Sequence, residues 1–96
     1  MYKTMVEARK PIKIVARLFL AEGQWGVRPG AMVVYAKEST SPILCLSIET
    51  GETRPTQAAI VEWLEGRARH SVKEALQLDE QEALKLVIES EIKIES

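Results

Sequence analysis

One stretch decides how this chain of 96 residues is expected to fold: Leu84-Lys85-Leu86-Val87-Ile88-Glu89-Ser90-Glu91-Ile92-Lys93-Ile94. Its even-numbered positions carry large aliphatic residues everywhere except at Ser90. Five of the six odd positions from Lys85 to Glu95 are charged. Because side chains alternate between the two faces of a strand, the pattern predicts a strand with one aliphatic and one charged face. Such a strand needs a neighbouring strand and a layer that covers its aliphatic face.

The same stretch also allows a helix, because Asp79-Glu80-Gln81-Glu82 has the composition of a helix start. A helix would leave Leu86 and Ile94 away from its apolar face, whereas a strand misplaces only Val87. The strand is therefore favoured over residues 84–95. A hybrid, in which a helical turn gives way to a strand near residue 86, remains an alternative.

The N-terminal half of the chain is typical of strands. Alternating or β-branched runs cover residues 12–20, 31–36 and 43–48. Glycine and proline residues between 21 and 30 indicate a connection of about ten residues. Turns are expected at residues 38–42 and 50–52. Short connections favour an antiparallel meander, because parallel neighbours need long crossovers.

Helical spacing follows these strands. Apolar residues recur on one face from about residue 55 to residue 69, and Thr53 or Thr56 is suited to cap the start of this helix. Ser71 and Glu74 have the spacing of a capping box, which predicts a short second helix there. The chain is thus expected to form a single α+β domain over residues 1–96. Its mostly antiparallel sheet, a three-stranded N-terminal meander plus a C-terminal strand, would pack against one long and one short helix.

Composition narrows the classes of function. The net charge is −1, which gives no overall field for nucleic acid or an anionic membrane, although residues 1–48 carry +4 and residues 49–96 carry −5. No apolar run approaches the ~20 residues of a membrane span, so a cytoplasmic protein is expected. Cys45, the only cysteine, excludes an intramolecular disulfide and falls in an apolar run typical of a buried thiol. With His70 as the only histidine and no phosphate-binding glycine loop, neither a catalytic pair nor a cofactor is expected.

Trp25 and Arg28 are the candidate partner-binding residues. They lie in the glycine-rich segment between the first two strands, and tryptophan and arginine are enriched at the energetic centres of interfaces. Alternatively, Trp25 folds back and covers an open edge of the core.

A basic group gives the alternative of a nucleic-acid-binding accessory protein. Its candidate residues are Arg54, Arg67, Arg69 and Lys73. The helix dipole alone explains cations near a helix C-terminus, and nearby glutamates weaken the case for phosphate contacts.

A third hypothesis is a metal-dependent nuclease. Glu49 and Glu52 follow a predicted strand, and Glu91-Ile92-Lys93 has the acid-x-lysine spacing of some such enzymes. The repeating charged face of residues 85–95 explains the same residues without a metal.

The main hypothesis is a small non-catalytic module that binds a protein partner. Lys13 and Arg17, on the outward face of the first strand, could lie opposite Glu89, Glu91 or Glu95. This pairing could form within one chain, or between two chains in a homodimer that joins through strand edges.

Overall fold

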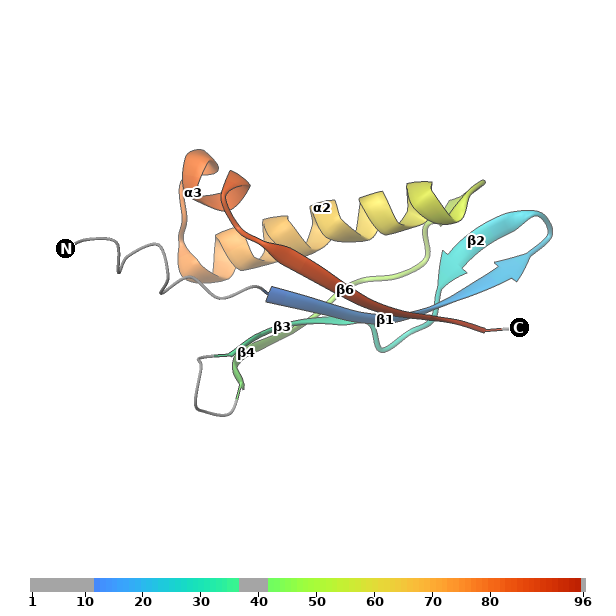
Figure 1. Ribbon diagram of the computed structural model, residues 1–96, viewed down its shortest axis with the longest axis horizontal. Helices are drawn as coiled ribbons and strands as arrows, with labels where there is room; N and C mark the ends of the chain where they lie inside the picture. The colour runs from blue at the N-terminus through green and yellow to red at the C-terminus, as the bar shows by residue number, and fades with distance from the viewer. Residues whose placement is uncertain (1–11, 37–41, 96) are drawn as a thin grey trace.

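The computed structural model describes residues 12–36 and 42–95, which form one sheet with helices packed on one side (Figure 1). A long helix, α2 (Gln57–Leu76), crosses one face of the sheet, and a short helix, α3 (Glu80–Leu84), follows it. This arrangement confirms the expected α+β class with one long and one short helix. Within the described residues the sheet has six strands: β1 (Ile12–Ala21), β2 (Gln24–Val27), β3 (Met32–Ala36), β4 (Pro42–Ser47), β5 (Thr53–Arg54) and β6 (Ile88–Ile94).

Strand β1 organises the sheet. Strands β2 and β3 both pair antiparallel with the same edge of β1, β2 along its C-terminal part and β3 along its N-terminal part. Between them the backbone N–H of Arg28 donates to the carbonyl of Arg17 (2.9 Å). Arg28 therefore lies opposite Arg17, whereas Met32, four residues further on, pairs with Val15, which is only two residues before Arg17. The returning chain thus carries two extra residues between these two positions. Strands β2 and β3 are therefore one long strand interrupted by a bulged turn around Pro29 and Gly30.

The expected ten-residue connection after the first strand is wrong. The chain turns within two residues, Glu22 and Gly23, whose φ angles of 54° and 76° are both left-handed. A two-residue hairpin needs this backbone because its twist matches that of the flanking strands. Residues from Gln24 onward therefore return at once to pair with β1.

Strands β4 and β5 extend the sheet on the side of β1 that β2 and β3 occupy. Strand β4 pairs antiparallel with β3, and β5 pairs antiparallel with β2, so these two segments form one edge. The expected strands at 31–36 and 43–48 are confirmed to within one residue. Residues 37–41 of the turn expected at 38–42 lie outside the described residues.

Strand β6 joins the opposite edge of β1 and runs parallel to it. Its register places Ile88 beside Ile12 and Ile94 beside Leu18. Ile12 N–H donates to the Val87 carbonyl (2.8 Å), and Glu95 N–H donates to the Leu18 carbonyl (2.9 Å). The C-terminal strand is thus confirmed and pairs with its own chain.

Strand β6 begins only at Ile88, so the hybrid alternative describes this segment best. Helix α3 occupies residues 80–84 because Asp79 and Glu82 form a capping box, in which each side chain accepts a hydrogen bond from the other residue's backbone N–H.

Helix α2 covers the aliphatic face of the sheet. Ile60, Leu64, Ala68 and Val72 recur every four residues and are fully buried. They pack in one cluster with Ile12, Ile14, Ala16 and Leu18 of β1. The Thr56 hydroxyl accepts a hydrogen bond from Ala59 N–H (3.1 Å), which confirms Thr56 as the N-cap.

The predicted break after residue 69 is wrong, since α2 continues without interruption to Leu76. The buried stripe runs on through Val72, so packing against the sheet holds the extra two turns. Helix α2 ends at Gln77, whose φ of 57° is left-handed. Leu78 N–H then donates to the Lys73 carbonyl (2.9 Å), as in a Schellman cap.

Candidate functional site: the outer edge of the C-terminal strand

The outer edge of β6 presents backbone groups that no strand in the described part of the chain pairs with. N–H and C=O groups alternate between the two sides of a strand, and the contacts of Val87 and Glu95 show that the odd-numbered residues face β1. The backbone groups of Ile88, Ser90, Ile92 and Ile94 therefore point outward. Within residues 12–36 and 42–95, β6 pairs with no strand other than β1. We call these four outward-facing positions the β6 edge.

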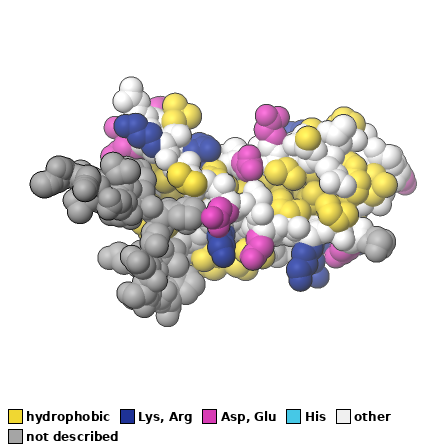
Figure 2. Space-filling model, viewed as in Figure 1, with side chains coloured by type: hydrophobic (Ala, Val, Ile, Leu, Met, Phe, Trp, Pro, Cys, Tyr) yellow, Lys and Arg dark blue, Asp and Glu magenta, His cyan; other side chains and the backbone are white. Residues whose placement is uncertain are grey.

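Exposed hydrophobic side chains lie at both ends of the β6 edge. Leu84 is 70% exposed and Val87 is 56% exposed just before the strand begins. At the other end Ile94 is 48% exposed and Leu20 is 55% exposed. These are four of the six large hydrophobic residues that are exposed in the described part of the chain. Figure 2 shows hydrophobic side chains gathered on this side of the molecule.

Leu20 and Ile94 share a shallow depression with Trp25, Phe19, Arg28 and Glu95. The register places Leu20 opposite Trp25, and Leu18 beside Ile94, so these apolar side chains lie on the helix side of the sheet. The β1–β2 hairpin, which carries Leu20 and Trp25, extends beyond the N-terminal end of α2 (Figure 1). The helix therefore leaves this apolar end of the sheet partly uncovered.

The charged face of β6 lies on the side of the sheet opposite α2. The register places Lys13 beside Glu89 and Val15 beside Glu91. Glu95 Oε1 accepts a hydrogen bond from Arg28 Nε (2.8 Å), and its Oε2 lies 3.9 Å from Arg17 Nη1. The opposite charges expected on the first and last strands thus meet within one chain.

The structure separates Trp25 from Arg28. Trp25 is half-buried and packs against the core on the helix side of the sheet. Arg28 lies on the opposite side, where its guanidinium stacks over the Phe19 ring at 4.4 Å and binds Glu95. The two residues therefore border the same depression from different faces and do not form one flexible contact loop.

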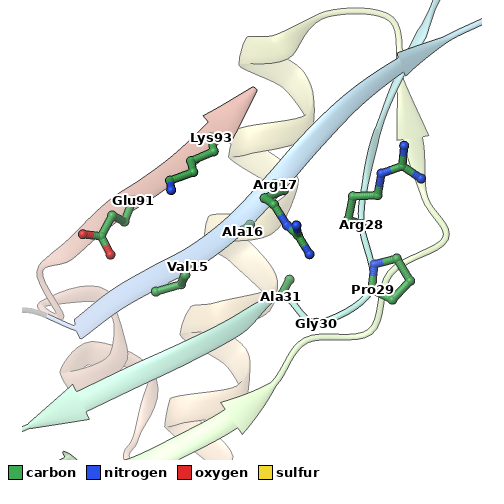
Figure 3. Close-up of a pocket in the computed structure, with 9 residues that line it drawn as sticks. All are labelled: Val15, Ala16, Arg17, Arg28, Pro29, Gly30, Ala31, Glu91 and Lys93. Atoms are coloured by element: carbon green, nitrogen blue, oxygen red, sulfur yellow. The ribbon is translucent and has the colours of Figure 1, made fainter. Parts of the chain in front are cut away.

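Arg28 also borders a second depression, where the bulged turn parts from β1 (Figure 3). Glu91 and Lys93 from β6 and Arg17 from β1 complete its rim. Because charges of both signs line it, this depression has no strong preference for an anion or a cation.

Most of the predicted nucleic-acid-binding residues contact their own chain. Arg69 Nη1 donates to the carbonyls of Ala83 (2.7 Å) and Leu86 (3.1 Å), which ties α2 to the segment that leads into β6. Arg54 Nη1 donates to Glu52 Oε1 (2.6 Å) and lies near the Trp63 ring. Arg67 is exposed.

Lys73, the fourth of these residues, joins the two helices. Its Nζ donates to Glu80 Oε2 (3.0 Å). This hydrogen bond and the Glu80 charge hold the pKa of Lys73 above its ordinary value. Three of the four cations are thus engaged by groups of the same chain.

The acidic candidates do not converge. Glu49 and Glu52 line a depression with Trp63 and Arg67, whereas Glu91 lines the one in Figure 3. Among the described residues, no three histidine, cysteine, aspartate or glutamate side chains are placed to hold a metal ion.

Cys45 corrects one expectation, because its thiol is exposed. It lies 3.6 Å from the Met32 sulfur on the sheet face opposite α2. His70 lies exposed on α2 with its Nε2 4.0 Å from Glu74.

Comparison with known proteins adds no relative. No protein family, curated protein or solved structure matches this chain. None of the helices in the described residues is both long and apolar enough to cross a membrane.

The sequence pattern pointed to residues 84–94 but missed Leu20 as part of the same surface. Leu20 continues the alternation of β1 beyond Leu18, the last buried residue of that strand. This overhang was the only feature of the sequence that could have indicated Leu20 as part of the surface. Where the helix would begin relative to that overhang depends on tertiary packing.

Proposed function

We propose that this chain is a protein-interaction module whose contact surface is the β6 edge. One observation carries the proposal: outward-facing backbone groups are flanked at both ends by exposed hydrophobic side chains. In recognition by strand addition, main-chain hydrogen bonds supply affinity and side-chain contacts beside the strand supply specificity. The β6 edge offers both.

The opposite edge of the sheet is less suited to the same role. Strand β4 begins with Pro42, and its pairing with β3 is irregular between Tyr35 and Ala36. Proline and irregular pairing protect a strand edge from adding another strand. No large hydrophobic residue with a described side chain is exposed on β4.

The alternative of nucleic-acid binding has less support. Arg54, Arg69 and Lys73 would each have to leave a hydrogen bond within the chain before contacting phosphate. The hypothesis of a metal-dependent nuclease has even less support, because its acidic residues line separate depressions.

Site-specific photocrosslinking tests the proposal. A benzophenone amino acid replaces Leu20 or Leu84 beside the β6 edge and, as the matched control, Ser47 on β4; the full-length chain is then irradiated in cells. We expect adducts with protein, a second copy included, from Leu20 and Leu84 and few from Ser47. Absence of adducts from both edge positions, or equal yields from Ser47, would contradict the β6 edge as the contact surface.

A further inference from the structure

We propose that the β6 edge binds a second copy of this chain. The two β6 strands run antiparallel about a twofold axis at Glu91, so that Ile88–Ile94 of both copies overlap completely. This inference rests on the proposed function and names its partner. It follows from three properties of the β6 edge: its backbone direction, its charges and the position of its exposed hydrophobic residues.

The backbone groups fit this pairing. In the full overlap Ile88 lies opposite the partner's Ile94, and Ser90 lies opposite the partner's Ile92. All four positions belong to the β6 edge, whose N–H and C=O groups point away from β1. Residues that face each other in this way exchange two hydrogen bonds per pair in an antiparallel ladder. The axis repeats both pairs, so every outward backbone group of β6 gains a partner.

The charges favour this register. On the face opposite α2, Glu89 lies opposite the partner's Lys93, and the axis repeats the pair. A shift by two residues would bring Glu91 opposite Lys93, but it would also bring Glu89 opposite Glu95 and shorten the ladder. The full overlap has one unfavourable contact, the two copies of Glu91 at the axis.

The exposed hydrophobic residues are arranged as a twofold axis requires. An antiparallel partner brings its Ile94 and Leu20, on the helix side of the sheet, to the end of β6 that follows Leu84, and the axis repeats this arrangement. Exposed apolar side chains of the two copies are thus brought together at both ends of the ladder. Both α2 helices lie on the same face, so the two sheets join into one continuous sheet from β4 to the partner's β4.

The first test is the oligomeric state of the purified full-length chain and of two variants at Ser90. Ser90→Pro and Ser90→Ala both remove the hydroxyl, but only proline removes the outward N–H. In sedimentation velocity over a micromolar concentration series we expect a dimer for the wild type and Ser90→Ala, and a monomer for Ser90→Pro. A monomeric wild type, or equal dissociation of the two variants, would overturn the inference.

Charge exchange tests the register. Glu89→Lys alone and Lys93→Glu alone each replace two attractive contacts by repulsive ones, so each should weaken the dimer about tenfold. An equimolar mixture of the two variants restores both contacts and should form a heterodimer. Failure of the mixture to associate more tightly than either variant would overturn the proposed register.

Two further variants test the proposed dimer independently of Ser90 and of the charge exchange. Leu84→Asp changes a 70% exposed residue outside the sheet, so it should weaken the dimer without unfolding the chain, as circular dichroism would verify. Glu91→Gln removes the repulsion between the two copies of Glu91 and should strengthen the dimer. Weaker association of this variant would contradict a twofold axis at Glu91.

The outcomes separate the two proposals. A monomeric wild type whose Leu20 and Leu84 positions crosslink to a different protein would overturn the second copy as partner and leave the proposed function standing. A monomer without such adducts would overturn both.

Discussion

Ser90 Oγ donates a 3.1 Å hydrogen bond to Glu65 Oε2, and this bond joins β6 to helix α2. Ser90 is the one polar residue in the aliphatic row of the C-terminal segment. The register places it beside Ile14, on the face that α2 covers. The break in the aliphatic row therefore coincides with the point where a glutamate of the helix meets the strand.

This bond predicts a small, measurable stabilisation. Because it is solvent-exposed, Ser90→Ala should lower the free energy of unfolding by about 0.5–1 kcal/mol. Urea unfolding at one fixed protein concentration would measure the change. A double-mutant cycle with Glu65→Ala isolates the pair: if the two changes are additive, the bond does not contribute.

Arg69 should be important for stability. Arg69→Met leaves the carbonyls of Ala83 and Leu86 without their donor. The free energy of unfolding, measured with urea, should fall by about 1–3 kcal/mol. Arg67→Met, at an exposed position on the same helix, is the matched control and should change stability by less than about 0.5 kcal/mol. Equal effects of the two variants would refute the structural role of Arg69.

The close approach of Phe19 to Gly26 predicts opposite effects at two glycines. A Cβ at Gly26 would lie 2.7 Å from Phe19 Cζ, so Gly26→Ala forces the ring away from Arg28 and should cost about 0.5–1.5 kcal/mol. Gly66→Ala in α2 meets nothing within 4 Å and should stabilise the chain by about 0.5–1 kcal/mol. Thermal unfolding would measure both.

A Phe19→Ala background is the control for this pair. Without the ring, Gly26→Ala should lose its penalty. A penalty that persists would mean that the backbone at Gly26, and not the Phe19 side chain, limits the substitution.

The Lys73–Glu80 pair predicts a loss of stability at alkaline pH. The pKa of Lys73 is raised in the folded chain, chiefly by its hydrogen bond to Glu80, so the contribution is complete below the ordinary lysine pKa of 10.5 and is lost as the pH rises beyond it. Urea unfolding at pH 9 and above, compared with Lys73→Met, would measure it. If the variant loses as much stability as the wild type over this range, the pair is not the cause.

Local periodicity predicted individual elements well. The spacing of Ile60, Leu64 and Ala68 predicted the buried face of α2, and the alternation of residues 88–94 predicted β6, because both patterns depend only on backbone geometry. The hairpin at Glu22 and Gly23 escaped prediction because a glutamate rarely adopts a left-handed φ. The last turns of α2 escaped because packing, not helix propensity, extends them through Val72.

The candidate site was only partly predictable for a related reason. Trp25 and Arg28 are three residues apart, but the hairpin places them on opposite faces of the sheet. Arg69 and Lys73 have the composition of a basic patch, yet α3 folds back and engages both. Composition indicates which chemical groups are present, whereas the contacts that use them come from distant segments.

The sequence by itself determined which face of each element is apolar and that the first and last strands carry complementary charges. Only the tertiary structure decided that β6 lies parallel to β1, that Lys13 lies beside Glu89 within one chain, and that Leu20 and Ile94 remain exposed together. The physical reason is that side-chain periodicity is a local property of the backbone. Strand neighbours and solvent exposure depend instead on how well distant segments cover one another.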